Sequence, residues 1–310
     1  MNLRFLEAFV WVARVKSFRA AAEKLNMTQS AVSSRIATLE SEFGRRLFDR
    51  DPREVRLTAA GRTLLIHAER LLHDGRAMRA ALMNAETVAG IVRIGAVESV
   101  VHTFLVPYVQ SLNSRYPGIE LELTAEPTRH LHDHLQRGVI DLALQTDTVF
   151  GDSIVNCPLC TMPMGWIASG DFEGGVERRI PLQDLASVPI ITFTRGSQPH
   201  AAVIDVFRLH DQAPRAVHCV TSLAAIVRLV HSGLGIASMP LAAVAAEIAE
   251  GSLRVLTCDA ELPPLPIMAS YRPDPTSPTL DLVAELAVAE VRAYCDRVGT
   301  YCALPASSVL

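Results

Sequence analysis

Side chains that can hydrogen-bond to the edges of nucleic-acid bases gather near the start of the chain. They comprise one threonine, one glutamine, three serines and one arginine, namely Thr28, Gln29, Ser30, Ser33, Ser34 and Arg35. A Gln amide can form two hydrogen bonds with adenine, an Arg guanidinium can do so with guanine, and a Ser hydroxyl can contact a base edge or a phosphate. This cluster therefore predicts the reading of double-stranded DNA.

A capped helix is the element that would present these side chains together. Thr28 can cap a helix that runs to about Phe43, because its hydroxyl can accept from the free amides of the first turn. Apolar residues at helical spacing predict the buried stripe of this helix. The stripe consists of Ala31, Val32, Ile36, Leu39 and Phe43.

A shorter helix precedes this one and completes a recognisable motif. Ser17 can cap a helix over residues 18–25, and Asn26 tolerates the left-handed backbone conformation that ends a helix abruptly. Two helices joined by a tight turn predict a helix-turn-helix, whose second helix places its N-terminal residues in the major groove. We expect Ala21 and Ala22 to pack against Val32 and Ile36, since small residues let the two helices approach closely.

The segments after the motif predict a wing and a pairing helix. Residues 47–57 form a short strand pair around Asp51-Pro52, and its arginines would contact the DNA backbone or minor groove. Those arginines are Arg50, Arg53 and Arg56. Thr58 caps a long amphipathic helix to about Glu86, for which a second copy of the same helix is the simplest partner.

Charge is divided between the two parts of the chain. The 310 residues carry a net charge of −4. Residues 1–61 contain 11 Lys and Arg against 7 Asp and Glu, whereas residues 62–310 contain 18 against 26. A basic first part and an acidic remainder fit a first part that meets phosphate.

From Gly90 the pattern changes to alternating strands and helices, which predicts an α/β domain. Its first unit contains strands at 92–97, 119–125 and 140–145, with helices at 99–116 and 128–137. A second unit follows from about 162 to 266, and a last helix over 280–297 returns to the first unit. Two α/β units joined by two crossings predict two lobes with a ligand cleft between them.

Several other functions lack the residues they require. No run of eighteen apolar residues predicts a membrane span, and the N-terminus lacks the features of a signal peptide, so we expect a cytoplasmic protein. Catalysis has no support, because no nucleophile elbow of the G-x-S-x-G type occurs. Six cysteines in such a chain favour reduced thiols.

Two possible metal motifs are incomplete. Cys157 and Cys160 have the spacing of a metal or redox pair, but no second pair completes a zinc site. His130 and His134 share one helix face, yet metal binding would require further ligands. We therefore expect neither a metal nor a cofactor.

The order and spacing of several motifs resemble one family, the LysR-type transcriptional regulators. The N-terminal motifs are Ser17-Phe18-Arg19-Ala20-Ala21-Ala22, Thr28-Gln29-Ser30-Ala31-Val32-Ser33, Leu47-Phe48-Asp49-Arg50 and Leu57-Thr58-Ala59-Ala60-Gly61. The later ones are Ile94-Gly95-Ala96, Gly138-Val139-Ile140-Asp141-Leu142-Ala143-Leu144 and Gly233-Leu234-Gly235-Ile236-Ala237. The resemblance covers the chain nearly end to end.

The resemblance implies a winged helix-turn-helix, a long linker helix and a two-lobed effector domain of the periplasmic-binding-protein type. The expected limits are 1–58 for the DNA-binding domain, 59–89 for the linker helix, 90–302 for the effector domain (lobe I about 90–161 and 267–302, lobe II about 162–266) and 303–310 for a tail. Arg19 joins the candidate DNA contacts. Ser34-Arg35 departs from the family's usual Arg-Gln, which puts the base preference in doubt.

The resemblance also implies partners. They are an interrupted palindrome near a promoter, a small-molecule effector such as an organic acid or amino acid, further copies of the chain in a homotetramer, and RNA polymerase. A cytoplasmic small-molecule sensor with an unused DNA module is the alternative function, and an enzyme ranks third. Residues 18–57 favour the first function, because a solute-binding protein has no use for them.

Candidate effector contacts lie at turns that follow strands, where helix N-termini and free amides gather. They are Ser99, Thr128, Thr146, Thr194 and Ser197, with Arg195 as a partner for a carboxylate. Thr221 and Ser222 are secondary candidates. Glu98 leaves two alternatives open: it points away and interacts favourably with a helix dipole, or it faces the cleft and selects a cationic or amide-bearing ligand.

Overall fold

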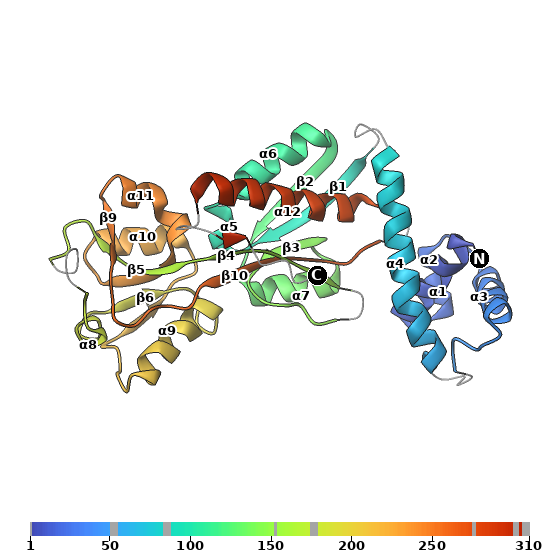
Figure 1. The fold of residues 1–310 in the computed structure, drawn as a ribbon, viewed down its shortest axis with the longest axis horizontal. Helices are drawn as coiled ribbons and strands as arrows, with labels where there is room; N and C mark the ends of the chain where they lie inside the picture. Colours follow the sequence, from blue (N-terminus) through green and yellow to red (C-terminus); the bar gives the residue numbers. More distant parts are fainter. Residues whose placement is uncertain are drawn as a thin grey trace. The chain divides into compact units, whose positions relative to one another are not determined.

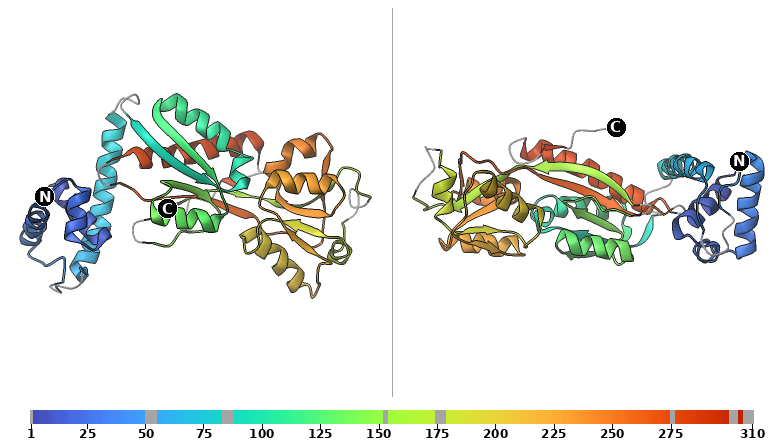
Figure 2. Two further views of the ribbon diagram at one scale, coloured as in Figure 1. Left: turned by 180° about the vertical axis from the view of Figure 1, so that it is seen from behind. Right: turned by 90° about the horizontal axis from the view of Figure 1, so that it is seen from below.

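The fold is described from a computed structural model, which is drawn in Figures 1 and 2. The structure describes residues 2–49, 55–82, 88–151, 154–173, 179–274, 277–299 and 304–305. The chain divides into two compact units. The first comprises Met1–Thr87 with Pro273–Leu282, and the second comprises Val88–Arg272 with Val283–Leu310.

The first unit is built around four helices. They are α1 (Leu3–Val15), α2 (Phe18–Lys24), α3 (Gln29–Phe43) and α4 (Ala59–Leu82). The predicted caps are confirmed, because the hydroxyls of Ser17 and Thr28 accept from the amides of Ala20 and Ala31, each over 3.2 Å. Asn26 adopts the left-handed conformation, with φ of 51°, and so reverses the chain between α2 and α3.

The core of this unit lies where α1, α2, α3 and α4 meet. Ala21 and Val32 are fully buried, and Ala22 and Ile36 are 3% exposed, as expected for the contact between α2 and α3. The prediction that Phe43 is buried is wrong, since this side chain is 42% exposed. The buried stripe of α3 ends at Leu39, one turn before the helix ends at Gly44.

The base of the predicted wing is an antiparallel bridge between Phe48 and Leu57. The amide of Asp49 donates to the carbonyl of Arg56 over 2.9 Å, and the amide of Thr58 donates to Leu47 over 3.0 Å. The Thr58 hydroxyl also accepts from the amide of Gly61, which caps α4 as predicted. The tip of the wing, including Arg50 and Arg53, lies outside the described residues.

The second unit contains two sheets, and the first of them forms lobe I. Its strands are β1 (Ala89–Ala96), β2 (Gly118–Ala125), β3 (Leu142–Gln145), β4 (Val155–Met162), β10 (Leu265–Tyr271) and β11 (Leu304–Pro305), in the order β11-β4-β10-β3-β1-β2. Strand β1 is parallel to both β2 and β3, whereas β10 is antiparallel to β3 and β4. Parallel strands end at the same edge of a sheet, so the segments after β1, β2 and β3 are neighbours.

The helices of lobe I cover both faces of its sheet. They are α5 (Glu98–Val101), α6 (Leu105–Arg115), α7 (Thr128–Arg137) and α12 (Thr279–Val298). Figure 1 shows α6 and α12 on one side and α7 on the other. The return of the last helix to lobe I is confirmed, since the Tyr108 hydroxyl on α6 donates to the carbonyl of Val283 on α12 over 2.8 Å.

The second sheet forms lobe II. Its strands are β5 (Met164–Ser169), β6 (Ile190–Thr192), β7 (Val217–Cys219), β8 (Ile236–Pro240) and β9 (Leu253–Leu256), in the order β7-β6-β8-β5-β9. Its helices are α8 (Leu182–Ala186), α9 (Gln198–Leu209), α10 (Leu223–His231), α11 (Ala245–Ala249) and a 3₁₀ turn, Leu241–Val244. Figure 2 shows α9 and α10 on opposite sides of this sheet, where each packs on its own apolar cluster.

The chain passes from lobe I to lobe II at Pro163, between β4 and β5, and returns between β9 and β10. Two crossings confirm the predicted bilobed architecture. The single helix predicted over residues 99–116 is wrong, because the structure has α5 and α6 separated at residues 102–104. The break turns the chain away from the edge of the sheet, so that α5 lies next to the pocket described below.

Candidate functional site

The first candidate site is the exposed face of α3. A helix advances about 100° per residue, so Gln29 and Ser33 lie within about 40° of each other, and Ser30 and Ser34 follow on one side of them, about 60° and 100° from Ser33. All four side chains are exposed. Thr28 is exposed at the same end, and its hydroxyl contacts that of Ser30 over 3.0 Å. The predicted polar face therefore exists as one continuous surface at the N-terminus of α3.

Arg35 lies on a different side of α3 from this surface. It is about 160° from Ser33 around the helix axis and beside the buried stripe. Its guanidinium donates to the carbonyl of Arg4 on α1 over 3.2 Å. The structure thus does not bring Arg35 together with Gln29 and Ser33.

The other predicted DNA contacts surround the motif. Arg19 is exposed on α2 and forms an ion pair with Glu23 one turn later, at 3.2 Å. Arg56 is exposed at the base of the wing, whereas Arg50 and Arg53 fall outside the described residues. Exposed arginines beside a reading helix can reach the phosphates that flank the groove.

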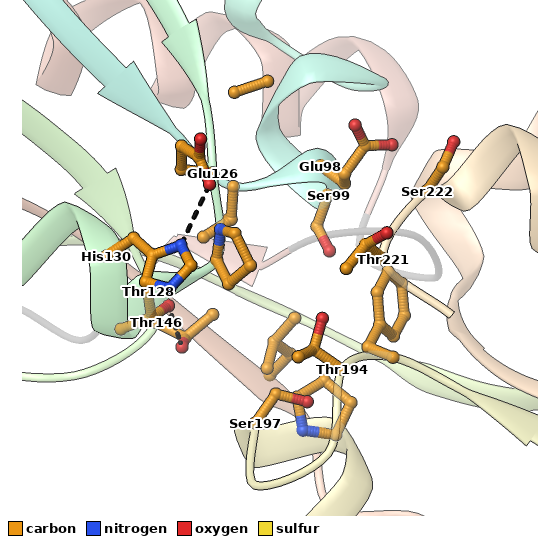
Figure 3. Close-up of a pocket in the computed structure, with 16 residues that line it drawn as sticks. Glu98, Ser99, Glu126, Thr128, His130, Thr146, Thr194, Ser197, Thr221 and Ser222 are labelled. Carbon is orange, nitrogen blue, oxygen red and sulfur yellow. Dashed lines mark hydrogen bonds and ion pairs between the residues drawn. The ribbon is translucent and has the colours of Figure 1, made fainter. Parts of the chain in front are cut away.

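The second candidate site is a pocket of about 320 Å³ in the second unit, shown in Figure 3. Its walls are the segments that follow parallel strands in both lobes. The lining residues are Val97, Glu98, Ser99, Ala125, Glu126, Pro127, Thr128, His130, Thr146, Phe193, Thr194, Ser197, Pro199, Thr221, Ser222 and Leu265. A crevice at the carboxyl ends of parallel strands is the usual place for a ligand in α/β folds.

Five of the six first-choice effector residues line this pocket. They are Ser99, Thr128, Thr146, Thr194 and Ser197. The secondary candidates Thr221 and Ser222 line it as well. Arg195 does not: it lies exposed in the loop between β6 and α9. The rule that ligand contacts lie at turns after strands therefore predicted the hydroxyl groups of the pocket correctly. It placed Arg195 in the pocket wrongly.

Three of the hydroxyls are already engaged in contacts that fix their positions. The hydroxyls of Thr128 and Thr146 are 2.9 Å apart, which ties the start of α7 to the end of β3. The Ser197 hydroxyl accepts from the amide of His200 and so caps α9. Each contact lies within a single lobe, so these hydroxyls are positioned by their own lobe.

Glu98 joins the two lobes. It lines the pocket from α5 in lobe I, and its carboxylate accepts from the amide of Leu223 in lobe II over 2.9 Å. Leu223 is the first residue of α10, whose N-cap Ser222 makes no side-chain hydrogen bond to the helix. The alternative in which Glu98 points away is therefore wrong: Glu98 faces the cleft, and its carboxylate lies at the N-terminus of a helix in the other lobe, where it interacts favourably with the dipole of that helix.

Glu126 and His130 are pocket residues that the sequence analysis missed or set aside. The Glu126 carboxylate follows β2 and lies 3.1 Å from the Nδ1 atom of His130, one turn into α7. Figure 3 shows this pair on one side of the pocket and Thr194 and Ser197 on the opposite side. The available signal was a Glu-to-His spacing of four residues directly after a strand that ends at the cleft.

The loop that carries Arg195 is held by His200. The amide of Gly196 donates to the Nδ1 atom of His200 over 3.3 Å. Because Nδ1 accepts this hydrogen bond, it carries no proton, and the ring is neutral. Burial lowers the pKa of His200 below its usual range, and the nearby positive charge of Arg195 lowers it further. At neutral pH the ring is therefore uncharged and can keep this contact.

Two further thiols meet in lobe I, since the side chains of Cys160 on β4 and Cys295 on α12 hydrogen-bond to each other, which raises the pKa of Cys160 and lowers that of Cys295. Within the described ranges, no three His, Cys, Asp or Glu side chains are placed to hold a metal ion. Cys258 is buried in lobe II, and burial raises the pKa of its thiol to about 11, so the thiol is protonated at neutral pH. No helix in the described part of the chain has the length and apolarity needed to cross a membrane.

Comparison with known proteins assigns both units. A family model described as "Bacterial regulatory helix-turn-helix protein, lysR family" matches residues 3–62. A second, described as "LysR substrate binding domain", matches residues 85–292. The two matches together include both candidate sites.

Curated relatives and solved structures agree with these matches. The chain is 30% identical over 268 residues to the HTH-type transcriptional regulator DgdR of Burkholderia cepacia, covering 86% of this chain and 85% of the relative. It is also 30% identical over 275 residues to a probable hydrogen peroxide-inducible genes activator of Mycobacterium leprae, covering 86% of each. A full-length OxyR variant from Pseudomonas aeruginosa shares the fold, with a TM-score of 0.57 and 23% identity, over 94% of this chain and 100% of that one. The chain belongs to the LysR-type transcriptional regulators, DNA-binding proteins that carry a substrate-binding domain.

Proposed function

We propose that this regulator binds an interrupted palindrome near a promoter. When a small molecule occupies the pocket between the lobes, the spacing or the bend of the bound DNA changes. The observation that carries the proposal is the presence, in one chain, of an exposed polar helix face and a pocket walled by both lobes. The first element reads DNA, and the second can register a ligand. The ligand is released unchanged, in keeping with relatives that are regulators.

The proposed reading face is the N-terminal surface of α3. Gln29 and Ser33 contact base edges in the major groove, while Ser30 and Ser34 contact base edges or phosphates beside them. Thr28 and the first amides of α3 favour a phosphate at the helix N-terminus. Arg35 reaches the DNA only at the border of this surface, because its guanidinium is bonded to α1.

Backbone contacts surround the reading face. Arg19 and Arg56, which are exposed, are proposed to contact phosphates, and Arg50 and Arg53 at the wing are proposed to do the same. We further propose that the protein acts in the cytoplasm, where promoter DNA is found, and that RNA polymerase is a partner there.

Self-association is proposed to deliver two reading helices to the two halves of the palindrome. Leu71 and Met78 on α4 lie seven residues apart on one face, and they are 41% and 62% exposed. An apolar pair at this spacing suits a helix-to-helix contact with a second copy. We propose a homotetramer with limits at 1–58 for the DNA-binding domain, 59–89 for the linker and 90–302 for the effector domain.

The proposed response is a shift between two arrangements of the lobes. A ligand that contacts Thr128 in lobe I and Thr194 in lobe II binds the closed arrangement better than the open one. It shifts the equilibrium only by this difference in affinity. The altered relation between lobes then changes the spacing or the bend of the bound DNA.

Footprinting tests the proposal. DNase I protection is measured on the DNA between this gene and its divergently transcribed neighbour, with the wild type and with Gln29→Ala. We expect two protected half-sites with the wild type and their loss with Gln29→Ala at equal protein concentration. Ser41→Ala, an exposed change at the far end of α3, is the control. Protection that is identical for wild type and Gln29→Ala would remove the assignment of the reading face.

A further inference from the structure

We propose that the pocket between the lobes selects a compact ligand with a cationic amine on an apolar body and rejects plain carboxylic acids. This inference rests on the proposed function, since it concerns the ligand of that same pocket. The observations that carry it are the signs of the charges in the pocket wall, the occupant of the α10 N-terminus and the apolar side chains opposite the carboxylates.

The charged side chains of the pocket wall are acidic except for one histidine. Among the lining residues, all within the described part of the chain, none is Lys or Arg. Glu98 and Glu126 contribute two carboxylates, and His130 contributes at most one positive charge. A bound carboxylate would therefore meet like charges in a partly dehydrated space, where such repulsion is stronger than in water.

One of the helix N-termini at the pocket, that of α10, already has a carboxylate beside it, whereas the N-terminus of α7 has no side-chain cap and lies between Glu126 and His130. The N-terminus of α10 points its free amides toward the cleft, and the Glu98 carboxylate accepts from the first of them, that of Leu223, over 2.9 Å. In lobe II the N-terminus of α9 is also capped, by the Ser197 hydroxyl. A ligand carboxylate would have to displace a group of the protein to bind the Leu223 or the His200 amide.

Glu126 offers the matching contact for a cation. Its Oε2 atom is paired with His130, and among the described residues no other hydrogen bond or ion pair reaches this carboxylate. Carboxylate oxygens accept up to about four hydrogen bonds in all, so an ammonium group can bind Glu126 without removing His130. A charge-assisted contact of this kind is roughly twice as strong as a neutral one.

The wall that lobe II contributes to the pocket suits the apolar part of a ligand. Lobe II contributes Phe193 and Pro199, and the hydroxyls of Thr194 and Thr221, but no charged side chain among the described lining residues. Pro127 of lobe I adds to the apolar surface. The volume of about 320 Å³ is at the lower end of the range for small-molecule sites, so the ligand is compact.

Matched ligand sets test the charge preference directly. Two sets are titrated into the full-length protein by calorimetry and by thermal shift: phenethylamine, 2-phenylethanol and phenylacetate, and hexylamine, hexanol and hexanoate. Within each set the body is similar and only the end group changes its charge. We expect the amine to raise the melting temperature, and its Kd to be at least about tenfold lower than that of the acid.

A matched pair of variants locates the effect. Glu126→Gln should raise the Kd of the amine about tenfold while changing that of the alcohol by less than about twofold. Glu120→Gln is the control, because Glu120 is an exposed residue of β2 that does not line the pocket. It should leave both Kd values unchanged.

Each other outcome overturns the proposal. An acid that binds as tightly as its amine contradicts the charge preference, and an amine affinity unchanged by Glu126→Gln contradicts the residue assignment. Failure of both amines to bind below about 10 mM also contradicts it, because a complementary site should exceed that affinity. None of these results affects the footprint on promoter DNA, so a failure of this inference is distinguishable from a failure of the proposed function.

Discussion

The proposed reading face of α3 and the pocket between the lobes both bring several polar groups together, but in different ways. On α3 the groups lie within two turns of one helix and are exposed on the side away from an apolar core. In the pocket they come from segments between Val97 and Leu265, and several are fixed by contacts with one another. Changes on the helix should therefore alter recognition alone, whereas changes in the pocket should alter recognition and stability together.

The largest effect on stability and DNA binding should come from disrupting the close packing of α4 against the base of the wing. A Cβ atom added to Gly61 would overlap the carbonyl oxygen of Leu47 and contact Leu57. Gly61→Ala should destabilise the first unit by about 3 kcal/mol, because backbone must move. Mobility-shift binding should be lost, while a ligand of the pocket still binds.

Gly75→Ala is the matched control for that prediction, since both glycines lie on α4. Its added Cβ would meet only Leu3, at an ordinary distance of 3.6 Å. This change should stabilise the helix by up to about 1 kcal/mol and should weaken DNA binding far less than Gly61→Ala does. Loss of ligand binding in Gly61→Ala would show that the two sites depend on one another, against the comparison above.

The next effect concerns the contact that joins the lobes. Glu98→Ala removes the acceptor of the Leu223 amide and should lower the free energy of unfolding of the effector domain by about 1.5 kcal/mol, a value reduced for its partial exposure. Urea unfolding measures this loss. Glu98→Gln, which retains an acceptor oxygen, should lose less, and equal losses for both variants would mean that the hydrogen bond is unimportant.

A smaller effect is expected on the reading face. Ser33→Ala should weaken specific DNA binding by about 1 kcal/mol, since one hydrogen bond to a base edge is lost. Because Ser33 is exposed, the melting temperature should stay the same. Mobility shifts with specific and scrambled DNA measure the difference, and a reduced melting temperature would contradict the separation of recognition from stability in this region.

The smallest effect is expected at the wing. Arg56→Ala should weaken binding to all DNA sequences by a few tenths of a kcal/mol at moderate salt, and reduce the slope of log K against log salt by about 1. Arg292→Ala, an exposed change in the second unit, should not alter that slope. A change in sequence preference on loss of Arg56 would instead place this side chain in a groove.

The features that sequence predicts well are those determined by near neighbours. Thr28 caps α3 through Ala31, and Gly138 ends α7 with φ of 71°, both within a few residues. The separation of α5 from α6 was missed because residues 102–104 include neither Gly nor Pro. The burial of Phe43 was overestimated because periodicity does not show where the covering helices end.

In the pocket, too, the contacts between residues distant in sequence could not be predicted. The hydroxyls of Thr128 and Thr194 were predictable because turns after strands lie at a common edge. The partner of Glu98 was not predictable, because Leu223 is 125 residues away and meets it only when the two lobes come together. Arg195 was misplaced for a related reason, since its direction depends on a loop held by His200.

The contact of Glu98 with α10 also affects how strongly other carboxylic acids in the cell can compete for the cleft. A group tethered within the same molecule acts at an effective concentration of order millimolar or above, and it does not diffuse away. A free organic acid of similar intrinsic affinity would compete with it for the Leu223 amide only above that concentration. Under the ligand preference proposed above, this contact would reduce the response of the cleft to cellular carboxylic acids.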